Sequence, residues 1–187
     1  NLDRLLLARI AGLHVVGPYG AVNDLIKQCM VVISEAIAGA YIAIAKRAAA
    51  AGDDERAREV LEHAFRAYTA VAAFGSAFIM RFERPAIDTL LGESFRVPTE
   101  NLVPIFVAAA VLMVYRSFYF GQVIFFVQSS KLELAASAAM VSVVGVLSAL
   151  MVPKYMAHGA AFALLGGQLV ACLIYLTASK RLYVMPV

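Results

Sequence analysis

Three ionisable side chains interrupt an apolar stretch that is long enough to cross a membrane. The stretch runs from Ala21 to Arg47 and contains Asp24, Lys27 and Glu35. At helical spacing, positions 24, 28, 31 and 35 share one face, and position 27 lies beside them. Glu35 stands about 14 residues into the stretch, or roughly 21 Å along a helix axis. A carboxylate at that depth costs about 2.5–3.5 kcal/mol on insertion scales, so such residues usually face a bundle interior or a wet cavity.

This polar stripe has two interpretations that the sequence leaves open. Polar residues along an apolar span are typical of a solute pathway, and they are equally typical of a static ion pair inside a helix bundle. Lys27 also has a simpler interpretation, in which its ammonium reaches the membrane surface along its own aliphatic stem. If the stripe lines a pathway, Lys27 is a candidate substrate-binding cation. Asp24 and Glu35 are then candidates for balancing charge or for carrying a coupling proton.

A second polar group lies near the middle of the apolar stretch 102–127. Arg116 is followed by Tyr119 and Gln122, which flank the same helix face at i+3 and about i+6. We predict that these three residues join Lys27 in binding an anionic substrate. The alternative is that Arg116 and Glu35 form a static buried pair.

The composition indicates a membrane protein. Of the 187 residues, 62% are hydrophobic and 16% are charged, and the mean hydropathy is +0.79. Soluble domains usually carry about 25% charged residues. The formal net charge is +3, but the basic residues stand mainly at the ends of apolar runs. Membrane flanks therefore explain them better than nucleic-acid binding does.

No pattern of catalytic, metal-binding or cofactor-binding residues is visible, and we expect no enzyme. Glycines between Gly12 and Gly17 have loop-like spacing, but no Lys followed by Ser or Thr completes a phosphate-binding loop. The adjacent acids Asp53 and Asp54 follow Gly52 and are explained as the start of a helix. The cysteines and histidines, which could bind metal, are isolated from one another in the sequence: Cys29, Cys172, His14, His63 and His158.

The apolar runs predict an all-α, polytopic membrane helix bundle over residues 1–187. Residues 1–16 resemble the end of a spanning helix whose start is missing, and Gly17 to Gly20 gives a turn signal. Residues 48–66 are expected to form an amphipathic loop helix, placed in the cytoplasm by a small excess of Lys and Arg on that side. Pro85 is expected to end the second span. Five full spans are predicted, near 21–46, 65–82, 102–127, 134–152 and 158–179.

The last predicted span carries small residues at strict four-residue spacing. Gly159, Ala163, Gly167 and Ala171 would lie on one helix face. Small residues at this spacing let membrane helices approach closely. We therefore predict that Gly167 lies at a close contact between helices.

Four segments together resemble the C-terminal half of Wzx-type polysaccharide and O-antigen flippases, in the multidrug/oligosaccharidyl-lipid/polysaccharide exporter superfamily. In the first segment the matching residues are Asp3, Gly17 and Tyr19. In the last, Met156 stands where the family often has glycine. The segments are LDRLLLARIAGLHVVGPYGAVNDL, KRAAAAGDDERAREVLEHAFR, FERPAIDTLLG and LMVPKYMAHGAAFAL.

The resemblance implies a two-lobed transporter of which this chain is one half. It implies translocation of an undecaprenyl-type lipid-linked oligosaccharide across the bacterial inner membrane, for surface polysaccharide such as lipopolysaccharide O-antigen. The expected partners are the bilayer, that lipid-linked substrate and the missing N-terminal half. The alternatives are a drug or cation antiporter of the same superfamily, or a membrane enzyme acting on lipid-linked sugars. Deep cations disfavour the first alternative, and the lack of a paired-carboxylate site disfavours the second.

Overall fold

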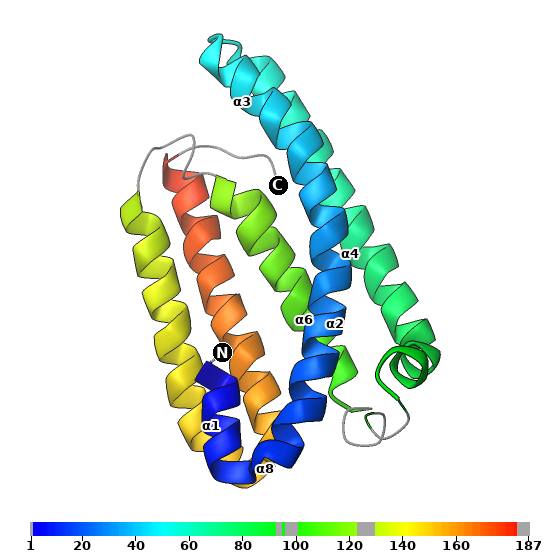
Figure 1. Cartoon of the computed structure of the whole chain (residues 1–187). Helices are drawn as coiled ribbons and strands as arrows, with labels where there is room; N and C mark the ends of the chain where they lie inside the picture. The colour runs from blue at the N-terminus through cyan, green and yellow to red at the C-terminus, as the bar shows by residue number, and fades with distance from the viewer. Residues whose placement is uncertain (1, 93–94, 96–100, 123–129, 183–187) are drawn as a thin grey trace.

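The fold is all-helical, as the apolar periodicity predicts (Figure 1). A computed structural model describes residues 2–92, 95, 101–122 and 130–182. No strand occurs within these ranges. The core comprises apolar side chains from every long helix, and α6 (Val103–Val114) contacts α2, α4 and α8. This central helix therefore positions residues that face several neighbours.

The first two helices meet at Gly12, which has a φ of 89°. Helix α1 (Leu2–Ala11) ends there and α2 (Leu13–Ile37) begins. The turn predicted at Gly17 to Gly20 is wrong, because Pro18 lies inside α2. A proline removes one backbone hydrogen bond, and helices in membranes tolerate this loss when neighbouring helices restore the packing. The helix therefore begins at Leu13, not near position 21, and every residue on it lies further along the axis.

Helices α2 and α4 form a long hairpin whose tip projects beyond the other helices (Figure 1). After α2 come the π-turn η1 (Ala38–Ile42) and α3 (Ala43–Ala50), and α4 (Asp54–Leu90) returns. Gly52 adopts a φ of 78° at the tip, and the Asp53 side chain accepts a hydrogen bond from the Arg56 backbone N–H at 3.0 Å. The apolar stripe expected within 48–66 is buried at Ala57, Leu61 and Ala64, but the helix that carries it begins at Asp54 and is the first part of α4, not a separate loop helix.

Pro85 does not end the second long helix. Helix α4 continues through it to Leu90 and closes at Gly92, which has a φ of 97°. The helix loses the hydrogen bond that the Pro85 nitrogen cannot donate, yet Ile87 beyond it is buried in the core. The packing of the last turn offsets the lost bond, so the prediction that Pro85 ends this helix is wrong.

Helix α8 (Ser130–Leu182) is folded back on itself at Met156. Met156 has φ 47° and ψ −122°, so the helix is interrupted there. The two arms, 130–155 and 157–182, lie antiparallel. A Cβ added to Gly167 would overlap Cγ2 of Val144, and one added to Gly159 would lie 2.5 Å from the backbone of Met151. Both glycines are buried. This confirms the close helix contact predicted at Gly167.

The four-residue stripe of small residues behaves differently on the two arms. On arm 157–182, Ala163 and Ala171 are buried along with Gly159 and Gly167. On arm 130–155, the small residues at 138, 142 and 149 are exposed, and Ala136, Val144 and Val152 are buried instead. The arms therefore contact through one glycine face and one face of larger side chains.

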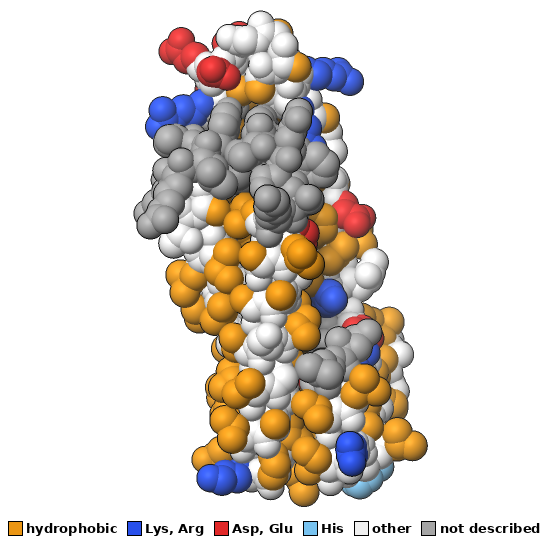
Figure 2. Space-filling view, turned by 90° about the vertical axis from the view of Figure 1, so that its left-hand side faces the viewer, with side chains coloured by type: hydrophobic (Ala, Val, Ile, Leu, Met, Phe, Trp, Pro, Cys, Tyr) orange, Lys and Arg blue, Asp and Glu red, His pale blue; other side chains and the backbone are white. Residues whose placement is uncertain are grey.

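Two helical stretches are long and apolar enough to cross a membrane. They are Leu13–Ala50 and Leu132–Ala178, and the second contains the fold-back at Met156. Only 22% of the most apolar window in each is buried, whereas the core helix of a soluble protein would be mostly buried. Large apolar side chains such as Leu13, Phe74 and Leu150 are exposed. On the face drawn in Figure 2, hydrophobic side chains lie along most of the length, and charged side chains lie at both ends and in a group at mid-height on the right. These features support a membrane protein.

Candidate anion site between α2, α6 and α8

The deepest guanidinium hydrogen-bonds a neutral amide. Arg116 lies in the π-turn η3 (Tyr115–Tyr119), which continues α6 and precedes the short 3-10 turn η4 (Phe120–Gln122). Its Nε donates a hydrogen bond to Oε1 of Gln168 on α8 at 3.0 Å. Arg116 is half-buried, and Gln168 is only 7% exposed. Within the described part of the chain, Arg116 forms no ion pair.

Lys27 and the same glutamine line one small cavity. A small cavity of about 30 Å³ is lined by Lys27, Asn23 and Gln168, together with apolar side chains of α6 and α8. Lys27 is exposed at its rim. An ordered water needs about 10–15 Å³, so the cavity itself has room for one or two waters, and a larger anion would contact Lys27 from the exposed side of this residue. Lys27 is thus related to Arg116 through Gln168, which hydrogen-bonds the arginine and lines the cavity with the lysine.

The backbone places this group deep in the bundle. Lys27 stands about 14 residues after Leu13, or roughly 21 Å along α2. Gln168 directly follows Gly166 and Gly167, which pack closely against Leu147 and Val144 of the other α8 arm. Close packing leaves this part of α8 little freedom to shift. Gln168 is therefore held on a rigid support.

Asp24 pairs with an arginine of α1 that the sequence analysis did not assign to it. It forms an ion pair with Arg4 of α1, in which Arg4 Nη1 donates to Asp24 Oδ2 at 2.9 Å and Nη2 donates to Oδ1. Arg4 Nη2 also donates to the carbonyl oxygen of Gly20 at 3.3 Å. The neighbouring Asp3 is 4% exposed and accepts a hydrogen bond from the hydroxyl of Tyr19 at 3.0 Å. Asp24 therefore joins α1 to α2 and does not lie beside Arg116.

The expected inward orientation of Glu35 is not found. Its side chain is exposed, while its neighbour Ser34 is fully buried and donates a hydrogen bond to the carbonyl of Met30. Because α2 begins at Leu13, Glu35 lies roughly 33 Å along the helix. A hydrocarbon core is about 30 Å thick, so the depth estimated from a start near position 21 was too great.

Tyr119 and Gln122 do not add to the site as expected. Tyr119 is completely buried, and its ring packs against Phe65, Tyr68 and Phe120 at centroid distances of 5.2, 6.1 and 5.2 Å. It supports the junction of α4 with η3, and the expectation of an open contact to substrate is wrong. The side chain of Gln122 lies outside the described residues.

Sequence reasoning missed Gln168 and a second polar contact on the same arm of α8. The hydroxyl of Tyr175 donates to Glu133 Oε2, and the Ser137 hydroxyl donates to Glu133 Oε1 at 3.2 Å. Gln168 and Tyr175 are two turns apart and share one helix face. A signal was present, because Gln168 interrupts an otherwise apolar run, and polar residues inside membrane spans usually face other helices.

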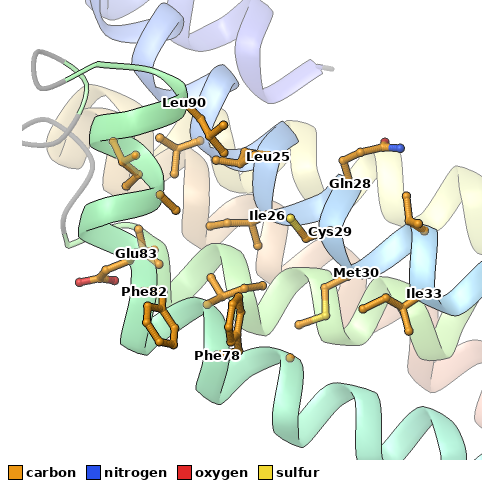
Figure 3. A pocket seen from close by; sticks show the side chains of 17 residues that line it. Leu25, Ile26, Gln28, Cys29, Met30, Ile33, Phe78, Phe82, Glu83 and Leu90 are labelled. Carbon is orange, nitrogen blue, oxygen red and sulfur yellow. The ribbon is translucent and has the colours of Figure 1, made fainter.

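A separate, apolar cavity lies between α2 and α4 (Figure 3). Its volume is about 490 Å³, and Ile26, Met30, Phe78 and Phe82 contribute to its lining. Gln28 and Glu83 also border it, but Figure 3 shows their polar ends directed away from the apolar side chains. This cavity suits hydrocarbon and not an ion.

Metal chemistry finds no support within the described ranges. They contain no group of three or more His, Cys, Asp or Glu residues able to hold a metal ion. Cys29 and Cys172 are free thiols.

Comparison with known proteins finds no matching family model, no similar curated protein and no similar solved structure. The site must therefore be interpreted from its own geometry.

Proposed function

We propose that the chain is one half of a transporter that translocates a lipid-linked oligosaccharide across the bacterial inner membrane. The observation that carries the proposal is the pair of cations, Lys27 and Arg116, that adjoin the buried amide of Gln168. Neither forms an ion pair with a described carboxylate. A phosphate or diphosphate group on a lipid carrier supplies the missing negative charge.

The cost of placing charge in a membrane explains why this observation matters. Charged side chains within spanning segments are expensive and usually mark ion or substrate pathways or are paired with one another. The Asp24–Arg4 pair illustrates the second case. A guanidinium that hydrogen-bonds an uncharged amide keeps its full positive charge. It therefore attracts an anion from the substrate more strongly than a neutralised one does.

The fold-back of α8 adds support from the family resemblance. Met156 adopts φ 47° and ψ −122°, a backbone conformation that glycine occupies far more readily than other residues. The resembled flippases often have glycine at this position. The turn that the resemblance implies is thus compatible with the backbone here, although the residue differs.

The alternative of a drug or cation antiporter receives less support. Such a protein needs an acidic group accessible in an interior path. Asp24 is neutralised by Arg4, and Glu35 is exposed on the outside of α2. The proposed function includes no catalytic residue and no cofactor.

The proposed topology has α2, α4, the α6 segment and both arms of α8 crossing the membrane, with the hairpin tip in the cytoplasm. Cysteine labelling in a Cys29→Ala/Cys172→Ala background tests it. Ala50→Cys lies near the tip and Lys154→Cys near the fold-back, and both positions are exposed. We expect an impermeant thiol reagent to label only Lys154→Cys in intact cells. Labelling of Ala50→Cys instead would reverse the orientation.

A reconstitution experiment tests the transport activity. The full-length protein in liposomes should move a fluorescent polyprenyl-diphosphate oligosaccharide between leaflets, measured as its loss of accessibility to a membrane-impermeant quencher. A glycolipid with the same sugar on an uncharged anchor is the matched control. Equal rates for the two lipids, or no movement of either, would contradict the proposal.

A further inference from the structure

The guanidinium of Arg116 is fixed by a hydrogen bond from Nε, the nitrogen nearest the backbone. Nε donates to Gln168 Oε1 at 3.0 Å. Among the described residues, no hydrogen bond is made by its two terminal nitrogens. Arginine binds phosphate best through two parallel N–H groups. With Nε already occupied, the terminal pair is the edge that remains for such a contact.

The other end of Gln168 faces the cavity at Lys27. Because arginine can only donate, the oxygen of the amide must face Arg116, and the side chain also lines the small cavity with Lys27 and Asn23. Gln168 thus hydrogen-bonds one cation and lines a cavity with another, and the two cations come from different segments of the chain. Its helix is fixed by the contacts of Gly166 and Gly167 with the opposite arm.

We infer that Gln168 is a positioning residue: it fixes the Arg116 fork next to Lys27, so that the two cations bind one phosphate-containing head group. This inference rests on the proposed function and extends it to a specific residue. An uncharged acceptor is required in this role, because a carboxylate at the same position would neutralise Arg116. The source of the phosphate is taken to be a lipid head group.

Binding measurements on the full-length protein in detergent test the inference. The probes are a polyprenyl diphosphate, the corresponding uncharged polyprenol and inorganic pyrophosphate. The preference for the diphosphate lipid over polyprenol is the readout. We expect Gln168→Met, which keeps the length of the side chain, to reduce this preference about tenfold, as for loss of one charge-assisted hydrogen bond. Gln168→Glu should reduce it further, because it pairs Arg116 with a carboxylate. Polyprenol binding should not change.

Two comparisons separate positioning from a general structural effect. Gln28→Met changes the same residue type at an exposed position that borders the apolar cavity and does not line the small one, and it should leave the preference unchanged. Arg116→Lys keeps the charge but lacks Nε–H. In that background Gln168→Met should change the preference less than twofold, because the hydrogen bond is already absent.

The outcomes distinguish this inference from the proposed function. Wild-type preference in both Gln168 variants, with loss in Lys27→Ala and Arg116→Ala, would overturn the positioning role and leave the function standing. So would an equal effect of Gln168→Met in the wild-type protein and in the Arg116→Lys variant. No preference of the wild type for the diphosphate lipid would overturn both. Tighter binding of inorganic pyrophosphate than of the lipid would place a free anion in the site, against the lipid source.

Discussion

Two arginines in this molecule are bound in opposite ways. Arg4 donates two hydrogen bonds to the carboxylate of Asp24, so its charge is matched within the chain. Arg116 donates through Nε to the amide of Gln168, and no carboxylate among the described residues forms an ion pair with it. The first arrangement joins two helices and needs nothing more. The second leaves a guanidinium that the proposed function assigns to an anionic head group, and the difference separates a structural contact from a candidate site.

The largest effect is expected from removing Arg116, the arginine that hydrogen-bonds an amide. Arg116→Ala should lower transport about 100-fold, since it removes a charged contact to the head group worth roughly 3 kcal/mol. The midpoint of thermal unfolding should hardly change, because only a bond to a neutral amide is lost. Transport by reconstituted protein and unfolding in detergent are the measurements. Full transport by Arg116→Ala at wild-type protein levels would remove Arg116 from the path.

The close packing of the two α8 arms, which positions Gln168, can be disrupted at Gly167. Gly167→Leu should destabilise the bundle by about 3 kcal/mol, because even a Cβ there would overlap Val144 Cγ2. Gly145→Leu, on the partly exposed side of the other arm, is the control and should cost far less. Thermal unfolding of both variants decides the matter. Equal tolerance would mean that the two arms are not closely packed.

Removing the backbone strain at Met156 should change stability without altering the contacts of Arg4 or Arg116. Met156→Gly should raise the free energy of unfolding by about 1 kcal/mol, because glycine occupies φ 47° without the penalty that methionine pays. The methionine side chain is 56% exposed, so little packing is lost. Denaturant unfolding in micelles measures the change. A decrease in stability would show that this backbone conformation is not strained.

Removing the matched carboxylate should affect stability and not transport. Asp24→Asn leaves Arg4 without its counter-ion, and we expect a loss of about 1 kcal/mol, because the Asp24 side chain is 59% exposed. Transport should stay within twofold of wild type. A strong transport defect in a normally stable variant would support the hypothesis that Asp24 carries a coupling proton.

Glu35 should give the smallest effect. Its exposed position near the end of the apolar part of α2 leads us to expect that Glu35→Gln changes neither stability nor the dependence of transport on a proton gradient. Flux measured with and without an imposed pH difference tests this. Abolition of the gradient dependence by Glu35→Gln would restore the original hypothesis of a coupling carboxylate.

The helical class, the cap at Asp53 and the close contact at Gly167 could be predicted because each depends on local spacing. The Asp53 side chain caps the helix three residues before Arg56, and Gly167 belongs to a strict four-residue repeat. The boundaries near Pro18 and Pro85 were wrong because a proline signals only one lost hydrogen bond. Whether tertiary packing compensates for that bond cannot be read from neighbouring residues.

The site was only partly predictable for a related reason. Lys27 and Arg116 were identified as cations in apolar stretches, and their meeting at Gln168 depends on how three helices cross. Tyr119 was assigned by helix periodicity, but the π-turn η3 changes that periodicity. The pairing of Asp24 with Arg4 depends on the turn at Gly12, which the sequence reading placed several residues later.

The π-turns η1 and η3 change the helical register of the segments that follow them. Each accommodates more residues per turn than an α-helix does, so every position after it is rotated relative to an unbroken helix. Deleting one residue within η1 (Ala38–Ile42) would rotate the α3 end of the hairpin by about 100°, leaving the bundle below it unchanged. The same deletion within η3 would carry Tyr119 out of its aromatic contacts and Phe120 with it. Each π-turn therefore sets which side chains are buried in the segment that it begins, Ala45 after η1 and Tyr119 within η3.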